Sequence, residues 1–385
     1  MTLVDAPCQL RLQKPPTKAT MLLRRQVILS AAACGMLSPA LVACSSSADE
    51  QEAAQALRRP LTGADSDHTH VMRELVRYAT LAPSSHNTQC WTFHLQDRAI
   101  VIAPDLSRRC PVVDPDDHHL YVSLGCATEN LAHAALAAGM QANASFDAGG
   151  KGDITVSLES TRASVTPMFQ AIAERQCTRG DYDGQPISND ELRLLERAGM
   201  GNGVRVMLLT ERAAMEKVLA YVVAGNTAQM DNPAFVAELK EWIRFSANEA
   251  QMTGDGLFAA TTGNPTMPRW LASPAMSLFY TPKSENDRYA RQIRNSAGIA
   301  VFVSESSDKA YWIESGRCYE RFALQATALG LRNAFVNQPV EVGSIRPQLA
   351  SALGLGSQRP DLVVRFGRGP KMPMSMRRPV QSVLV

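Results

Sequence analysis

The chain has 385 residues, of which 45% are hydrophobic and 20% charged, so it is long enough for two or three domains and can bury a sizeable core. Its 39 Lys and Arg residues nearly balance its 37 Asp and Glu residues, which gives no support for a nucleic-acid partner. Because no run of about 18 apolar residues follows Ser45, the sequence excludes a membrane protein with several spans.

The first 43 residues are predicted to be an export leader (1–43). Arg24 and Arg25 precede an uncharged stretch, residues 27–43, which is typical of a signal peptide. The stretch ends in LVAC, which resembles a bacterial lipobox and would make Cys44 the lipid-carrying first residue of the mature protein. The paired arginines resemble a twin-arginine signal, and an ordinary secretory leader with two incidental arginines is the alternative. Because the residues before it fit no leader, Met21 is the expected start.

These features predict an exported, periplasmic lipoprotein that a lipid on Cys44 attaches to a membrane, with residues 44–69 as a tether. The cysteines beyond Cys44 form an odd number without a CxxC pair, which fits neither a disulfide framework nor a zinc site. We expect most of them to be small buried apolar side chains. They are Cys90, Cys110, Cys126, Cys177 and Cys318.

The body begins with a helix signal over residues 71–81, which carry apolar side chains at helical spacing. Residues 91–95 and 99–103 flank Gln96-Asp97-Arg98 and are predicted to form a hairpin. Further apolar, β-branched runs predict strands at 154–158, 204–209, 299–304 and 362–366. Strands and helices do not alternate strictly and no GxGxxG follows a strand, so the predicted class is α+β, a mixed sheet with helices on its faces.

Two helical stretches, 125–139 and 316–330, match each other at a constant offset. The matched pairs are Gly125 and Gly316, Glu129 and Glu320, Ala135 and Ala326, Ala137 and Ala328, and Gly139 and Gly330. Small residues all round indicate closely packed central helices, each ending on a glycine that can cap it. Chance similarity between alanine-rich helices is the alternative. A long repeat that occurs twice predicts a fused two-fold pair, with halves at 70–160 and 161–385.

Polar side chains cluster in APSSHNTQCW, residues 82–91, between the first predicted helix and the first strand. Pro83 ends the helix, and the serines, asparagine and glutamine that follow offer neutral donors and acceptors. Planar heteroaromatic rings with alternating N–H and C=O groups are bound by such groups. Taken alone, the stretch is equally consistent with a polar surface loop.

This stretch resembles the APSxxNxQPWxF motif of the FMN-dependent nitroreductase family. In that family the loop contacts the flavin ring and the ribityl chain. The resemblance implies that Ser84, Ser85, Asn87 and Gln89 make these contacts here. Cys90 replaces the family's usual proline, which affects the path of the loop rather than its polar groups.

A second motif, ERQCTRGDYDGQPISNDELRLL at residues 174–195, resembles the family's RxSxR element, which binds the FMN phosphate. Arg175 and Arg179 match the two arginines, while Cys177 stands where Ser or Thr usually donates. Two guanidiniums can neutralise a phosphate dianion with bidentate geometry. The alternative for these residues is a solvated basic helix face.

The end of the chain resembles the family's tail, whose basic residues also reach the phosphate. Arg377 and Arg378 both match, and the sequence does not choose between them. Earlier in the chain, Asn337 and Gln338 stand where the family places backbone amides against the flavin N5 edge. An N–H directed at N5 favours the reduced flavin and so tunes its potential.

The distribution of the motifs indicates a composite site. Dimeric nitroreductases take the loop from one subunit and the phosphate arginines from the other. Here the first half carries only the loop and the second half only the arginines, as in the Acg-like, fused-dimer branch that residues 70–385 resemble. The resemblance therefore implies a nitroreductase-like fold, one FMN per chain, and a pseudo-dimer that is a monomer in solution.

The resemblance also implies a reaction in which hydride passes from NAD(P)H through the flavin to a nitroaromatic, a quinone or a similar acceptor. We name no catalytic residue, because the cofactor carries the chemistry. A non-catalytic lipoprotein that sequesters FMN is the alternative function. Residues 255–291 are rich in aromatic residues, methionine and proline, and we expect a lid-like insertion there. It would form an acceptor pocket, seal the flavin off, or serve only as a structural excursion.

Two other functions receive little support from the sequence. The adjacent Ser84, Ser85 and His86 are unsuited to a nucleophile–base hydrogen bond, and no GxSxG elbow supports a hydrolase. No metal site is expected either, since His118 and His119 are sequence neighbours whose side chains should diverge. The aspartates before them more readily mark a helix entry.

Overall fold

The computed structural model describes residues 52–62 and 67–385. The leader at 1–43, the paired arginines within it and Cys44 lie outside the described residues, as does the first part of the 44–69 tether. The described part of that tether packs on the body. Ala54 is buried in a small apolar cluster with Ala250, Phe258 and Met376, and Arg58 donates to the carbonyl of Ser375 at 3.0 Å.

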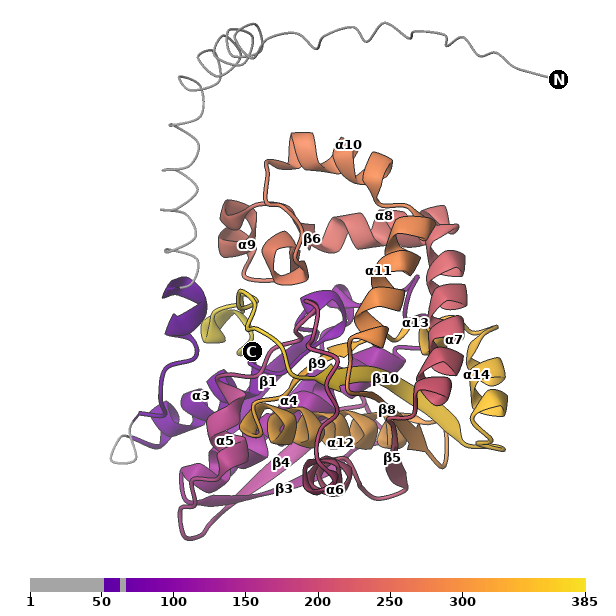
Figure 1. Cartoon of the computed structure of the whole chain (residues 1–385). Helices are drawn as coiled ribbons and strands as arrows, with labels where there is room; N and C mark the ends of the chain where they lie inside the picture. The colour runs from indigo at the N-terminus through magenta and orange to yellow at the C-terminus, as the bar shows by residue number, and fades with distance from the viewer. Residues whose placement is uncertain (1–51, 63–66) are drawn as a thin grey trace, which may run out of the picture. The chain divides into compact units, whose positions relative to one another are not determined.

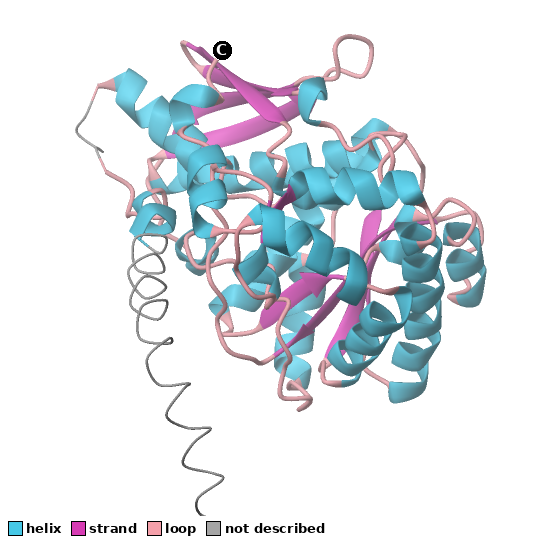
Figure 2. Cartoon of the chain, turned by 90° about the horizontal axis from the view of Figure 1, so that it is seen from above, coloured by secondary structure: helices cyan, strands magenta, loops and turns pink. Residues whose placement is uncertain are grey.

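The main strands form two separate four-stranded antiparallel sheets (Figure 2). The first has the order β1-β2-β4-β3 and the second the order β5-β8-β10-β9. Their strands are β1 Trp91–Gln96, β2 Ala99–Pro104, β3 Met140–Phe146, β4 Ile154–Ser160, β5 Val204–Leu209, β8 Gly298–Ser304, β9 Arg332–Phe335 and β10 Arg359–Gly367. A short parallel pair, β6 Ile243–Arg244 and β7 Leu257–Phe258, stands apart from both. The predicted hairpin and the other predicted strands are confirmed, and so is the α+β class. The single mixed sheet is wrong, because the main strands of each half pair only among themselves and only in antiparallel fashion.

The helices cover these sheets and fill the space between them (Figure 1). They are α3 His68–Ala79, α4 His118–Ala137, α5 Pro167–Ile172, α6 Asn189–Ala198, α7 Arg212–Met230, α8 Pro233–Trp242, α9 Ala247–Thr253, α10 Arg269–Phe279, α11 Pro282–Arg294, α12 Lys309–Ala328, α13 Gln338–Glu341 and α14 Arg346–Ala352. Short 3₁₀ turns occur at Ser85–Asn87, Leu106–Arg108, Ala259–Thr262 and Val380–Ser382. None of the helices in the described part of the chain is both long and apolar enough to span a membrane.

The two sheets have the same topology, which is the structural form of the repeat seen in the sequence. In each sheet the second strand along the chain leads into a long central helix, and the third and fourth strands follow it. That helix is α4 in the first half and α12 in the second. An equivalent order of strands and an equivalent helix in each half support the fused two-fold pair.

The central helices α4 and α12 cross at the matched glycines. A β-carbon on Gly125 would overlap the backbone carbonyl of Ile313, and one on Gly316 would overlap the carbonyl of Val122. These two contacts are related by the same offset as the repeat, so the crossing is symmetric. Glycine is required at both positions because only a hydrogen side chain lets two helix backbones approach so closely.

The main difference between the halves is the segment that connects the first strand of each sheet to the second. In the first half β1 and β2 are joined by a tight turn at Asp97-Arg98, whereas in the second half residues 210–297 separate β5 from β8. This segment, which we call the excursion, contains α7 to α11 and the β6–β7 pair. The predicted insertion at 255–291 is therefore the second part of a longer excursion.

The C-terminal end returns to the first half. Phe93 in β1 donates its N–H to the carbonyl of Val383 at 2.8 Å and accepts from the N–H of Val385 at 3.1 Å. The end of the chain thus lies against the edge of the first sheet (Figure 2). It ties the second half to the loop that precedes β1.

The helix crossing predicts a stability defect for Gly316→Ala. The added methyl group must push the α4 backbone away, so the free energy of unfolding should fall by about 1–3 kcal/mol in urea denaturation. Gly343→Ala is the matched control, because a β-carbon there meets nothing within 4 Å. Equal stability of the two variants would contradict the crossing as described.

Candidate functional site

A cavity of about 490 Å³ lies where the two halves meet. The first half lines it with residues 83–86 of the loop after α3 and with the first turns of α4. The second half contributes residues around Arg179, Asn337 and Arg365, and the excursion adds an apolar wall that includes Phe235, Phe245 and Tyr280. A volume of this size suits a small molecule or cofactor.

The loop after α3 has an unusual backbone. His86, Asn87 and Gln89 adopt left-handed conformations, with φ of 48°, 55° and 54°. Such conformations are unfavourable for residues other than glycine and persist only where other contacts enforce them, typically at functional sites. The loop is therefore held in shape by its surroundings.

The side chains of Asn87 and Gln89 enforce that shape. Asn87 Nδ2 donates to the carbonyls of Gly256 and Met376 at 3.0 and 3.2 Å. Gln89 Nε2 donates to the carbonyl of Gly254 at 2.8 Å, and its Oε1 accepts from the backbone N–H of Arg378 at 2.8 Å. Asn87 Oδ1 also accepts from Arg377 Nη1 at 3.0 Å. The side-chain amides of both predicted flavin contacts are thus engaged within the protein, and neither residue lines the cavity.

Ser84 and Ser85, the other predicted loop contacts, do line the cavity. Ser84 Oγ accepts from the backbone N–H of Gln89 at 2.8 Å, so its own hydrogen remains available to a ligand. His86 lies beside them, and burial together with the Arg179 guanidinium lowers the pKa of its imidazole to about 4. Cys90, which replaces the motif's proline, is buried, and burial raises the pKa of its thiol to about 11.

Arg175, predicted to bind a phosphate, is buried away from the cavity lining. Its Nε lies 3.1 Å from Glu320 Oε1, and its Nη2 donates to the carbonyl of Leu81 at 2.7 Å. Burial raises the pKa of Glu320 to about 7, against the attraction of the Arg175 guanidinium. This ion pair joins the segment before α6 to α12 and to the end of α3.

Arg377 and Arg378 also form hydrogen bonds within the protein, and neither residue lines the cavity. Arg377 donates to the carbonyls of Thr80, Leu81 and Ala82 at 2.8, 3.1 and 3.1 Å. It therefore satisfies the backbone carbonyls of the turn that follows α3. Arg378 donates to the carbonyls of Gln89 and Ser382 at 3.5 and 2.8 Å.

Arg179 is the predicted phosphate residue that does line the cavity. It is half-buried, and among the described residues no hydrogen bond or ion pair engages its guanidinium. Arg365 holds the peptides on either side of it, donating to the carbonyls of Thr178 at 3.1 Å and Gly180 at 2.7 Å. Its guanidinium also lies 4.1 Å from the ring centre of Tyr182. The sequence motifs do not include Arg365, although a charged residue inside the apolar strand β10 is a signal for such a role.

Asn337 and Gln338 both line the cavity. Asn337 Oδ1 accepts from the N–H of Val363 at 2.9 Å, and its Nδ2 lies 3.1 Å from His119 Nε2. Gln338 Oε1 is buried without a hydrogen-bond partner among the described residues. A buried acceptor of this kind is costly unless a ligand donates to it.

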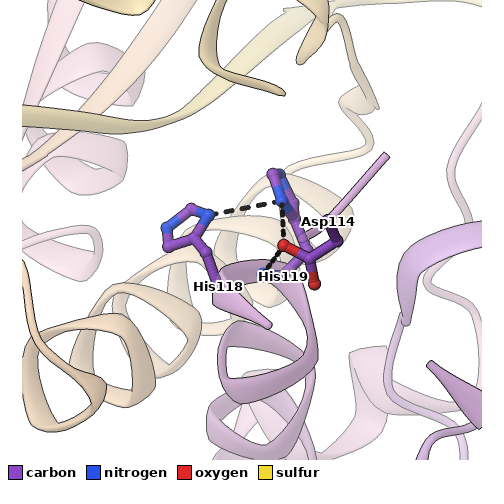
Figure 3. A group of neighbouring side chains, drawn as sticks. All are labelled: Asp114, His118 and His119. Carbon is purple, nitrogen blue, oxygen red and sulfur yellow. Dashed lines mark hydrogen bonds and ion pairs between the residues drawn. The ribbon is translucent and has the colours of Figure 1, made fainter. Parts of the chain in front are cut away.

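The expectation that His118 and His119 diverge is wrong. Their Nδ1 atoms lie 3.2 Å apart, and donor atoms of Asp114, His118 and His119 all lie within 4.8 Å of one another (Figure 3). The physical reason is that Nδ1 is bonded to Cγ, close to the main chain. Neighbouring rings can therefore meet there while their Nε2 atoms point apart, to Asp361 and to Asn337.

Glu129, which matches Glu320 in the repeat, has different partners in the first half. Arg317 and Arg321 of α12 both contact Glu129 Oε2 at 3.0 Å. Arg321 also donates to the carbonyls of Ala198 and Met200 at 3.2 and 3.0 Å, in the segment that follows α6. Glu129 and Glu320 match in the repeat, so the same carboxylate is used differently in the two halves.

The sequence is similar to nitroreductases over most of its length. No protein-family model matches the chain. Two proteins of Mycobacterium tuberculosis, from the strains CDC 1551 / Oshkosh and ATCC 25618 / H37Rv, are named for a proposed NAD(P)H nitroreductase activity. Each is 22% identical over 328 residues, which cover 81% of this chain and 90% of the relative.

Solved nitroreductase structures show a fainter likeness. One with bound FMN from Bacteroides fragilis is 14% identical and covers 53% of this chain and 89% of its own, with a TM-score of 0.33. Another with bound FMN, from Desulfitobacterium hafniense, is 14% identical and covers 58% and 98%, with a TM-score of 0.36. Both likenesses cover little more than half of this chain.

Replacing Arg175 should destabilise the fold rather than only weaken a ligand. In Arg175→Met, Glu320 loses its buried partner, and the free energy of unfolding should fall by about 3–5 kcal/mol near neutral pH. Arg175→Met combined with Glu320→Leu should recover much of the loss, because no unpaired charge remains. Chemical denaturation of the three proteins measures both effects.

The same variants have a defined pH dependence. The folded pKa of Glu320 lies above its usual value of 4.5, so protonation favours the folded state. Stability from this group is fully present below pH 4.5 and is lost as the pH rises through the folded pKa. Arg175→Met should therefore be less impaired at pH 5 than at pH 8. A defect independent of pH would show that Glu320 is not the group involved.

Proposed function

We propose that this protein binds one FMN per chain in the cavity between its halves and uses it to reduce a small acceptor of the nitroaromatic or quinone type. The observation that carries the proposal is Arg179, a cation without a protein partner among the described residues, at a cavity that both halves build. A guanidinium in this position suits a phosphate. The motif resemblance and the similarity to nitroreductases point to the same cofactor.

The other residues at the cavity fit this cofactor. Gln338 Oε1 needs a donor, Ser84 and Ser85 offer hydroxyl groups, and the excursion supplies an apolar wall for a flat ring. When bound, FMN would supply the redox chemistry, accepting hydride from NAD(P)H and passing it to the acceptor. The protein's part is to hold the phosphate through Arg179, orient the ring and exclude water from it. We therefore assign the predicted residues Asn87, Gln89, Arg175, Arg377 and Arg378 to shaping the site.

One cofactor per chain is the expected stoichiometry. Arg317 stands at the repeat position that matches Cys126 of the cavity lining, and it forms an ion pair with Glu129, which supports a single site. A pseudo-dimer within one chain also makes a monomer the expected state in solution.

Attachment to a membrane through a lipid on Cys44, with export to the periplasm, stays a proposal. Retention of Cys44→Ala in the membrane fraction would refute it.

Arg179→Gln should weaken FMN binding while leaving the fold intact. Loss of a charged hydrogen-bond donor to the phosphate should raise the dissociation constant about 10- to 100-fold in fluorescence titrations of the apoprotein. Arg193→Gln, at an exposed position of α6, is the control and should bind like the wild type. Unchanged affinity of the Arg179 variant would remove the main support for the site.

Turnover can be separated from sequestration with reduced protein. After anaerobic photoreduction of the FMN complex, mixing with a nitroaromatic or a quinone should restore the oxidised flavin spectrum rapidly. A reduced flavin that persists in the presence of these acceptors would favour the sequestering function instead.

A further inference from the structure

A series of hydrogen bonds between buried polar groups connects strand β10 to the cavity through Asn337. The backbone N–H of Val363 donates to Asn337 Oδ1 at 2.9 Å, which identifies the oxygen end of this amide. Its Nδ2 lies 3.1 Å from His119 Nε2. Because an amide nitrogen only donates, His119 Nε2 must accept and carries no proton.

This assignment determines the tautomers of both histidines. A neutral His119 without a proton on Nε2 carries it on Nδ1, which lies 3.2 Å from His118 Nδ1 and 3.5 Å from Asp114 Oδ1 (Figure 3). His118 Nε2 lies 3.2 Å from Asp361 Oδ1 and donates to that carboxylate. The Nδ1 of His118 is then free to accept from His119. Every ring nitrogen has a partner of the right kind.

Asp361 is well suited to be the final acceptor in this series of hydrogen bonds. It is fully buried, and Ser315 Oγ donates to its Oδ2 at 2.6 Å while Arg359 Nε lies 3.0 Å from its Oδ1. Although burial opposes it, hydrogen bonding to His118 lowers the pKa of Asp361 and keeps it an acceptor. Burial and the neighbouring His119 lower the pKa of His118 to about 4, so that ring stays neutral.

We propose that His119 is the positioning residue for the Asn337 amide, with His118 and Asp361 fixing its tautomer, so that the second N–H of Asn337 is presented to an acceptor atom of the molecule in the cavity. One N–H of Nδ2 is directed to His119, and Asn337 itself lines the cavity. The inference rests on the proposed function, which supplies FMN as that molecule. It assigns a role to His119, which none of the sequence motifs includes.

Protonation of His119 would disrupt this arrangement. An N–H on Nε2 would face the Asn337 N–H groups, and reversing the amide would set its NH₂ against the N–H of Val363. The charged and titratable groups around His119 are Asp114 before α4, His118 on α4, Glu341 on α13, Arg359 on β10 and His86 on the loop. Although burial opposes it, the Asp114 carboxylate raises the pKa of His119. FMN affinity should therefore fall as the pH drops through the pKa of His119.

The same assignment disfavours a metal ion at the cluster of Asp114, His118 and His119. A metal there would need a lone pair on Nδ1 of both rings, but the proton of His119 lies on Nδ1. Both carboxylate oxygens of Asp114 already accept backbone N–H groups, from His119 and Leu120 at 3.0 Å each. Asp114 thus serves the start of α4.

The test compares the full-length wild type with His119→Gln, His119→Phe and His133→Gln. FMN dissociation constants are measured by fluorescence from pH 5 to pH 9. Glutamine keeps an acceptor oxygen but cannot titrate, so His119→Gln should bind within about threefold of the wild type at pH 8 and lose the pH dependence. His119→Phe should bind about tenfold more weakly at pH 8, as expected for one lost hydrogen bond. His133, a partly buried histidine of α4 outside the cavity lining, is the matched control and should keep the wild-type profile.

A wild-type pH profile in His119→Phe would overturn the proposal. If the wild type binds no FMN, the proposed function fails, and the tautomers are read instead from ¹⁵N shifts of labelled histidine in the free protein. We expect a proton on Nδ1 of His119 and on Nε2 of His118, and the reverse pattern would refute the inference. Binding of one zinc ion per chain from zinc solution alone, lost in His118→Gln, would also refute it.

Discussion

The close crossing of α4 and α12 is the constraint on which the rest of the structure depends. Because Gly125 and Gly316 carry no side chain, each helix backbone contacts the carbonyl of a residue on the other helix. The two halves are then held in one arrangement, with the first turns of α4 facing the strands and loops of the second half. The cavity lies at this junction, so its walls come from residues far apart in the sequence. A shift of one helix against the other would separate Ser123 on α4 from Asn337 and Arg179.

Around this symmetric crossing, the two halves differ in which arginines pair with the matched glutamates. Near the cavity, Glu320 is occupied by Arg175, and Arg377 binds the end of α3, so these cations shape the site without entering it. In the other half, Arg317 and Arg321 bind Glu129 and the segment after α6. Only the first arrangement leaves an open space with a free cation, Arg179, among the described residues. The matched carboxylates Glu320 and Glu129 thus have different partners in the two halves.

Much of the fold could be predicted from the sequence, because strand and helix patterns are local. The small residues of the repeat indicated two closely packed central helices, although the sequence did not place their crossing at Gly125 and Gly316. The candidate site was predicted less completely. Five of the motif residues lie at the cavity, namely Ser84, Ser85, Arg179, Asn337 and Gln338. The sequence could not show that the side chains of Asn87, Gln89 and Arg175 bind other parts of the protein instead. Partners distant in the chain, such as Glu320 and Gly254, decide this. The convergence of His118 and His119 depends on side-chain rotation about a helix start, which spacing alone does not reveal.

The position of the excursion has a consequence for how such proteins can change. Residues 210–297 replace what is a tight turn in the first half, so they leave and rejoin the body at the ends of two adjacent strands. A segment attached in this way can be lengthened, shortened or exchanged without altering the sheet beneath it. Its inner face supplies the apolar wall of the cavity, whereas Arg179 and the loop after α3 belong to the body. Under the proposed function, changes confined to the excursion would alter the apolar wall of the cavity and leave Arg179 and the loop after α3 in place.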